Sequence, residues 1–308
     1  MDDRIDLTIQ QREAVEAELD RRTLAHKRRV GRIKRGAQLR AQRRTKAKKS
    51  KAAPQQAGQL DFLAIGDSWF DYPLNGNDIS LTNTAIAAQL TQIGSPPPLV
   101  LNYALYGQAT TAVLTYENQQ RIIDAASDPT QWLNGAPDAI LVSMGGDDLV
   151  GDQFAIYLDY DGSGLDAARF QGALDSVSAS YMDLFALRDA IAPGKPVIGH
   201  CYDYAIPNGL APICAGPWLQ PSIEFSGYDL AQGLAIVSSM IDRFTAMLQG
   251  LAAAAKNNFI LVDTRKTLAR VSSVQNGWAN ELHPYPAGFI LLAQKWLAVL
   301  QKHFPGSI

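Results

Sequence analysis

Cysteines and long apolar runs are both scarce in this sequence, and each scarcity excludes a class of protein. The two cysteines, Cys201 and Cys214, are too few for a disulfide framework and lack metal-site spacing. We expect two free thiols in a reducing compartment, or one bridge that closes the loop between them. No run approaches the ~20 apolar residues that span a bilayer, and residues 1–20 lack the apolar core of a signal peptide. These absences predict a cytoplasmic protein without a transmembrane segment.

Acidic residues are scarce at the start of the chain and abundant after it. Residues 1–58 hold 17 Lys and Arg against 7 Asp and Glu, a net charge of +10, whereas the rest of the chain carries −12. Residues 8–44 are rich in helix formers, and the Lys-, Ala-, Gln- and Pro-rich residues 43–59 are typical of a linker. The sequence therefore predicts a basic, helical or partly disordered arm and linker (residues 1–58) before a globular domain (residues 59–308).

The basic arm is compatible with several partners. It can be a solvated tail, or it can bind its own acidic body, a sister subunit or an anionic surface such as lipid or nucleic acid. The arm has no Phe, Trp or Tyr on which a base could stack, which weakens the nucleic-acid alternative. Attraction to acidic lipid would add peripheral membrane association.

Short apolar segments alternate with longer amphipathic segments from residue 60 onward. The short segments predict strands over residues 60–65, 99–103, 139–143, 196–200 and 259–262. The longer segments predict helices over residues 81–93, 110–126, 166–191, 229–255 and 286–303. Apolar strands joined by helices favour an α/β fold with a parallel sheet between two helical layers.

A polar turn, Gly66-Asp67-Ser68, directly follows the first predicted strand. Ligand sites of parallel sheets lie at the carboxyl ends of the strands, so this turn would present the Ser68 hydroxyl at such a site. A serine becomes a nucleophile when a base accepts its proton. Taken alone, the turn is also compatible with a serine that only caps a helix.

Histidine, the usual base near neutral pH, occurs four times. His26 in the arm and His303 near the C-terminus are expected to be solvated, and His200 after the fourth predicted strand is expected to be a buried, hydrogen-bonded residue that lines the cleft. His283 lies in a loop before the last helix, where a sheet presents catalytic groups. Ser68 and His283 together indicate a serine hydrolase.

Two further loops and several aromatic residues are expected to complete a site. Gly107 follows the second predicted strand, where a glycine lets a backbone N–H approach a ligand closely. A Gly-Gly-Asp-Asp turn (residues 145–148) follows the third. Aromatic residues nearby either form an apolar pocket wall suited to an acyl or aryl ester or pack under a long loop. The expected pocket residues are Trp69, Tyr72, Asp148, His200, Tyr202 and Tyr204.

In these motifs the chain resembles the SGNH hydrolases, also called the GDSL esterase/lipase family. Residues 65–72, IGDSWFDY, are similar to the family's first motif. GGDD (145–148) and NELHP (280–284) stand where the family carries Gly-x-Asn-Asp and Asp-x-x-His-Pro. The resemblance covers about residues 60–305. It implies a three-layer α/β/α flavodoxin-like sandwich with a five-stranded parallel sheet, and ester hydrolysis through an acyl-serine intermediate without metal or cofactor.

The resemblance also implies roles for individual residues. Ser68 would attack the ester carbonyl, and His283 would act first as base and then as acid. The oxyanion would be held by the N–H groups of Ser68 and Gly107 and by the side chain at position 147.

Two residues depart from the family pattern. Asp147 replaces an asparagine: ionised, it would repel the oxyanion, whereas protonated it could donate if burial beside Asp148 raises its pKa. Asn280 replaces the aspartate that orients the histidine. Either Asn280 or its neighbour Glu281 is expected to be the orienter, with Asp263 as a more distant candidate.

Three functions follow from these motifs and departures. The leading expectation is an esterase of broad acyl-ester class that acts on a small-molecule acyl ester. The alternatives are a lysophospholipase or thioesterase that the arm recruits to anionic lipid, and a degenerate SGNH protein that binds without turnover.

Overall fold

A five-stranded parallel sheet forms the centre of the structure. The computed structural model describes residues 2–46, 58–72, 85–211 and 216–308, and in the first range it describes side chains for residues 10–42 only. The strand order is β2-β1-β3-β6-β7, and every neighbouring pair is parallel. The strands are β1 (Asp61–Gly66), β2 (Leu99–Asn102), β3 (Ala139–Ser143), β6 (Val197–His200) and β7 (Phe259–Val262). The expected sheet is confirmed.

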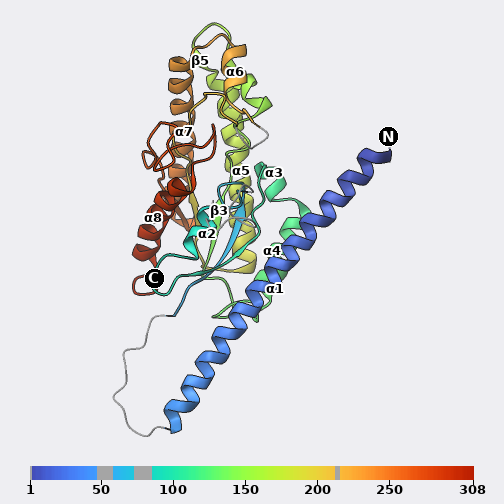
Figure 1. The fold of residues 1–308 in the computed structure, drawn as a ribbon, viewed down its shortest axis with the longest axis vertical. Coiled ribbons are helices and arrows are strands. Elements are labelled where there is room, and N and C mark those ends of the chain that lie inside the picture. The colour runs from blue at the N-terminus through green and yellow to red at the C-terminus, as the bar shows by residue number, and fades with distance from the viewer. Residues whose placement is uncertain (1, 47–57, 73–84, 212–215) are drawn as a thin grey trace.

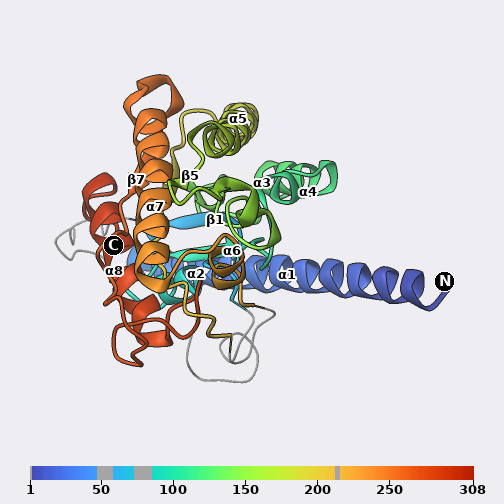
Figure 2. The same cartoon turned by 90° about the horizontal axis from the view of Figure 1, so that it is seen from above.

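Helices cover both faces of this sheet (Figures 1 and 2). On one face, α2 packs against α8, and on the other, α5 contacts both α4 and α7. These helices are α2 (Ile86–Leu90), α3 (Thr110–Val113), α4 (Tyr116–Ser127), α5 (Ala167–Ile191), α7 (Leu230–Ala253) and α8 (Pro286–His303). The layers and the strand order confirm the predicted α/β/α sandwich.

The order in which successive strands are added to the sheet reverses at β1. The chain passes from β1 outward to β2 and then returns to β3 on the other side of β1. In flavodoxin-like sheets the ligand crevice lies beyond the carboxyl ends of the strands at this reversal. The last residues of β1 and β3, Gly66 and Ser143, are paired in register. The turns that carry Ser68 and Asp147 therefore begin side by side at the same edge of the sheet.

The basic arm forms one long helix, α1 (Asp2–Lys46), which extends past the body at both ends (Figure 1). It contacts the edge strand β2, where a helix hides backbone groups that could otherwise pair with another chain. Leu19, His26 and Val30 are buried on one stripe of α1. Residues 47–57 of the expected linker lie outside the described residues, and the domain boundary at residue 58 stays a prediction.

Some element boundaries differ from the sequence expectation. The helix expected over residues 110–126 is divided into α3 and α4, because the Thr115 side chain accepts the Asn118 N–H and begins a new helix. The helix expected over residues 81–93 is described only as α2, and residues 81–84 lie outside the described part. The smaller elements are η1 (Asp152–Tyr157), β4 (Leu158–Asp159), β5 (Gly164–Leu165), α6 (Gln220–Phe225) and η2 (Ala255–Asn257).

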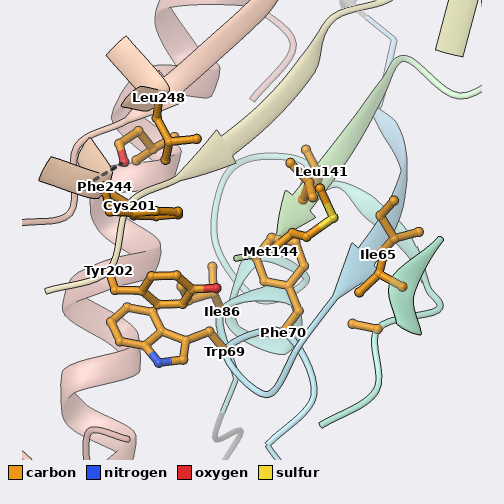
Figure 3. Packing of buried hydrophobic residues seen from close by; sticks show 14 of the residues in the cluster. Ile65, Trp69, Phe70, Ile86, Leu141, Met144, Cys201, Tyr202, Phe244 and Leu248 are labelled. Atoms are coloured by element: carbon orange, nitrogen blue, oxygen red, sulfur yellow. Dashed lines mark hydrogen bonds between the residues drawn. The ribbon is translucent and has the colours of Figure 1, made fainter. Parts of the chain in front are cut away.

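Buried hydrophobic residues fill the space between the sheet and α7 (Figure 3). Met144, directly after β3, and Phe244 of α7 belong to this core. Trp69 and Tyr202 meet edge to face with ring centres 5.1 Å apart. The turn that carries Ser68 is thus anchored by its neighbour's indole in the core.

Two further sequence expectations concern membrane-spanning helices and the two cysteines. None of the helices in the described ranges has the length and apolarity that a membrane crossing requires. Cys201 is buried, whereas Cys214 lies outside the described residues, so their pairing stays a prediction.

Candidate active site

The turn after β1 is shaped by a glycine that no other residue could replace without movement. Gly66 has φ of +133°, and a Cβ there would lie 1.9 Å from the Ser143 carbonyl oxygen. The Asp67 N–H donates to that same oxygen at 2.9 Å, and the Asp67 carbonyl then accepts the N–H groups of Phe70 and Asp71 at 3.1 Å. The chain therefore turns tightly and leaves Ser68 at the carboxyl end of β1.

Ser68 and His283 meet, although 215 positions separate them in the chain. The Ser68 hydroxyl donates to Nε2 of His283 over 2.7 Å. Nδ1–H of the same ring donates to Oδ1 of Asn280 over 3.1 Å. This arrangement selects the tautomer in which Nε2 is free to accept the serine proton. The geometry is that of a nucleophile, a base and an orienting residue.

Asn280 is therefore in contact with the histidine, while the other two orienter candidates are not. Oδ1 of Asn280 also accepts the His283 N–H at 2.8 Å, and Nδ2 donates to the Tyr72 hydroxyl at 2.9 Å, which fixes the amide's orientation. Asp263 instead forms an ion pair with Arg265 at 2.7 Å.

Glu281 does not orient His283, so this sequence expectation is wrong. The fully buried carboxylate accepts hydrogen bonds of 2.5 to 3.0 Å from four backbone N–H groups. The donors are Gly209, Trp218, Leu219 and Gln220. Adjacent residues in this loop point in opposite directions, so Glu281 anchors a neighbouring loop while Asn280 faces the histidine.

His283 is enclosed by aromatic rings. Tyr72 stacks on it with ring centres 4.1 Å apart, and Trp218 meets it edge-on at 5.7 Å. The Trp69 indole N–H donates to the Leu282 carbonyl at 3.0 Å and further ties the two loops together. Burial lowers the pKa of His283 to about 3. The imidazole is thus neutral, and able to act as a base, down to strongly acidic pH.

The expected oxyanion donors are the N–H groups of Ser68 and Gly107 and the side chain of Asp147. The N–H groups of Ser68 and Gly107 make no hydrogen bond to any other described residue. Asp147 and Ser68 line the same cavity, and Gly107 is not among its lining residues. Oδ2 of Asp147 is buried and has no partner within the described residues. Burial and then the charge of Asp148 raise the pKa of Asp147 to about 6.

A second buried acid, Asp67, lies next to Asp147. Its carboxylate accepts the Trp69 N–H at 3.0 Å and the hydroxyls of Ser143 and Tyr202. Burial and then the charge of Asp147 raise the pKa of Asp67. Two neighbouring buried carboxylates repel each other, so ionising both costs more free energy than ionising either one alone.

His200 is buried and hydrogen-bonded, as expected, in the network behind this acid pair, but it does not line the cavity beside Ser68. Its Nε2 lies 2.9 Å from the Ser143 hydroxyl, and its Nδ1 lies 2.8 Å from the Cys201 carbonyl. The ring is fully buried and stacks on Trp69 at 5.3 Å. Burial lowers the pKa of His200 to about 4.

The cavity beside Ser68 is small and mostly apolar, with a volume of about 50 Å³. Sequence reasoning missed most of its walls. Leu149 and Val150 directly follow the glycine-rich turn and could have been inferred from that position, whereas Met240 and Ile241 come from the inner face of α7. The other lining residues are Asp67, Trp69, Gly146, Tyr202, Asp203, Ala205, Trp278 and Leu282.

Three other expected pocket residues lie away from this cavity. Asp148 accepts the N–H and hydroxyl of Thr110 at 2.9 and 2.8 Å. Tyr204 donates to Asp242 at 2.7 Å on the exposed side of the loop. Tyr72 lies against His283. Of the expected pocket residues, only Trp69 and Tyr202 line the cavity.

Comparison with known proteins places the fold. No protein-family model matches the chain, and no curated protein matches it. A lipase from a goat rumen metagenome superposes with a TM-score of 0.51 and 17% identity, covering 78% of this chain and 97% of the lipase. The fold is that of the SGNH hydrolases. A Streptomyces rimosus extracellular lipase gives a TM-score of 0.47 and 19% identity over 79% of this chain and 99% of its own.

The SGNH fold as it stands in this chain offers no evident metal site. Within the described ranges, no three His, Cys, Asp or Glu side chains are grouped as a metal ion would require.

Proposed function

We propose that this protein is a serine hydrolase that cleaves carboxylic esters through an acyl-serine intermediate. The observation that carries the proposal is the relay from the Ser68 hydroxyl to His283 and on to Asn280, with donor–acceptor distances of 2.7 and 3.1 Å. It lies at the carboxyl end of β1, where this fold presents its ligand site. The description of the rumen neighbour as a lipase agrees with this reaction class.

The reaction would proceed in two halves around the same pair. Ser68 Oγ attacks the ester carbonyl carbon while its proton passes to Nε2 of His283, and the carbonyl oxygen becomes the oxyanion. His283 then gives that proton to the leaving alcohol as the C–O bond breaks, which leaves the acyl-serine. A water molecule attacks the acyl group, gives its proton to His283, and the acid leaves as Ser68 is reprotonated.

The oxyanion needs donors, and Asp147 supplies one only as the neutral acid. The Ser68 and Gly107 N–H groups are proposed as the other two. Since burial raises the pKa of Asp147 to about 6, its carboxyl would donate below that pH and repel the oxyanion above it. We therefore propose an esterase that works best in acid.

The cavity size favours a short acyl group. Its volume of about 50 Å³ compares with the ~150 Å³ of an engineered apolar cavity that binds benzene. Acetyl or propionyl esters fit this space better than long-chain lipids do. This is why the lysophospholipase alternative is not preferred.

Labelling with a fluorophosphonate at pH 5 tests the proposal directly. The wild type and the surface control Ser176→Ala should be modified, whereas Ser68→Ala should not. The wild type should also hydrolyse p-nitrophenyl acetate faster than the palmitate ester. Absence of labelling at every pH would support a binding protein instead, and faster palmitate hydrolysis would support the lipid-directed alternative.

A further inference from the structure

One side chain of α1 reaches the loops around the active site. Arg22 is mostly buried, with 18% of its side chain exposed. Nη2 donates to both carboxylate oxygens of Asp71 at 3.0 and 3.1 Å, and Nη1 donates to the carbonyls of Asn102 and Ala104 at 3.3 and 3.0 Å. Nε donates to Glu18 on the same helix at 2.8 Å. All three guanidinium nitrogens are therefore engaged.

The first partner of Arg22 belongs to the turn of the nucleophile. Asp71 follows Ser68 by three residues, and its N–H donates to the Asp67 carbonyl inside that turn. The Asp71 side chain is 7% exposed. Both Asp71 oxygens accept from Nη2, while Nη1 binds the carbonyls of Asn102 and Ala104, so the rigid planar guanidinium spans the two segments.

The other partners of Arg22 begin the loop that leads to Gly107. The Asn102 side chain joins this loop to the nucleophile turn a second time. Its Nδ2 donates to the Phe70 carbonyl at 2.8 Å, and its Oδ1 accepts the Ala104 N–H at 3.0 Å. The guanidinium and this amide together bridge the two segments that carry the proposed backbone oxyanion donors.

Two of the other ion pairs of α1 lie at the surface. Arg12 bonds to Glu117 of α4 with both side chains more than half exposed, and Lys27 bonds to Asp128 just beyond α4. Neither pair touches the Ser68 turn or the Gly107 loop. Exposed pairs of this type contribute little to stability, which makes Arg12 a matched control for Arg22.

We propose that Arg22 is a positioning residue of the active site, through which the basic arm holds the Ser68 turn and the Gly107 loop at a fixed separation. The inference rests on the proposed function for its catalytic meaning. The arm is then a part of the catalytic unit, in addition to any surface it binds. Loss of the clamp would displace oxyanion donors, which act in the transition state more than in substrate binding.

Kinetics of full-length Arg22→Met, Arg22→Lys and Arg12→Met on p-nitrophenyl acetate at pH 5 test this role. We expect kcat of Arg22→Met to fall about 10- to 100-fold, the size of effect of a small misplacement, with KM within about twofold. Arg22→Lys keeps the charge without the fork and should fall between Arg22→Met and the wild type. Arg12→Met should match the wild type.

Amide hydrogen exchange gives a readout that does not depend on turnover. Residues 66–72 and 102–108 should both exchange faster in Arg22→Met and stay unchanged in Arg12→Met. Unchanged exchange in Arg22→Met would overturn the clamp, and so would a kcat equal to that of Arg12→Met. A wild type without any turnover would instead reject the proposed function, and exchange alone would then decide on the clamp.

Discussion

The two sides of the Ser68 hydroxyl differ in how their polar groups are satisfied. On the base side, His283, Asn280 and Tyr72 form a closed set of hydrogen bonds without a formal charge. On the oxyanion side, Asp147 holds a buried oxygen without a partner among the described residues, close to a second acid, Asp67. The base side therefore carries no formal charge, whereas the oxyanion side is acidic and holds a buried oxygen that has no partner among the described residues.

This difference gives the two departures from the expected motif a common meaning. An amide stands at position 280 where the resemblance implies an acid, and an acid stands at position 147 where it implies an amide. The amide leaves the low pKa of His283 uncorrected by a nearby charge, so the base stays free in acid. On the proposed function, the neutral acid at position 147 would donate to the oxyanion over the same pH range. Each change alone would impair an enzyme that works at neutral pH, whereas we expect the two together to confine activity to acid pH.

The largest effect is expected from removing the base. His283→Ala leaves Ser68 without a proton acceptor, so kcat on p-nitrophenyl acetate should fall at least about 10³-fold. His303→Ala, at the exposed end of α8, is the matched control and should behave like wild type. Equal activity of His283→Ala and His303→Ala would show that His283 takes no part in the chemistry.

The second-largest effect on kcat is expected from replacing the Asp147 carboxylate with a neutral amide. Asp147→Asn replaces a repelling carboxylate with a donor, so kcat at pH 8 should rise about 10²-fold, the effect of one oxyanion donor. At pH 4, where Asp147 is protonated, the gain should be small. Asp152→Asn, an exposed change of the same charge, should have no effect at either pH. A fall at pH 8 would contradict the assigned role.

The same variant should change stability with a defined sign. The folded pKa of Asp147 lies above its unfolded value, so the folded state binds the extra proton and loses stability as pH rises from about 4 to 6. Asp147→Asn should therefore melt at a higher temperature than wild type at pH 8, with little difference at pH 4. Thermal melts at both pH values check this.

A negative charge beside His283 should raise the lower pH limit of activity. Asn280→Asp puts a carboxylate beside His283 and should raise its pKa by about one unit or more. The acid limb of the pH–kcat profile would then move upward, and the rate at pH 3.5 should fall about threefold or more. A limb that does not move would show that Asn280 does not control the histidine.

The smallest effect is expected from a single hydroxyl. Tyr72→Phe keeps the stacked ring but leaves Nδ2 of Asn280 without its partner, at a cost of about 1 kcal/mol. kcat should fall roughly fivefold, the equivalent of that energy, with the pH limits unchanged. A loss as large as that of His283→Ala would mean that the ring's contact with His283 has also been lost.

Sequence reasoning reached the elements that local patterns encode. The strands were predicted because buried parallel strands are short apolar runs, and Ser68 because its turn directly follows such a run. His283 was singled out because few histidines exist and only this one lies in a loop of the expected kind. The fold class already implies that the loops carrying Ser68 and His283 meet at the carboxyl ends of the strands, so their pairing could be predicted from the sequence.

The contacts that sequence reasoning missed are set by packing between distant segments. Nothing local distinguishes Arg22 from the other arginines of α1, since its role comes from the docking of that helix on β2. Asn280 and Glu281 are neighbours, and only the loop's path decides which faces His283. His200 is the last residue of β6, a position typical of site residues, but its ring turns inward toward Ser143.

The pH dependence of kcat between pH 3 and 9 tests the central claim most directly. We predict a wild-type maximum between about pH 3 and 6, set by His283 and Asp147, with a fall above pH 6 that is absent in Asp147→Asn. A wild-type rate that rises to a plateau at pH 8, or profiles of the two proteins that coincide, would contradict it.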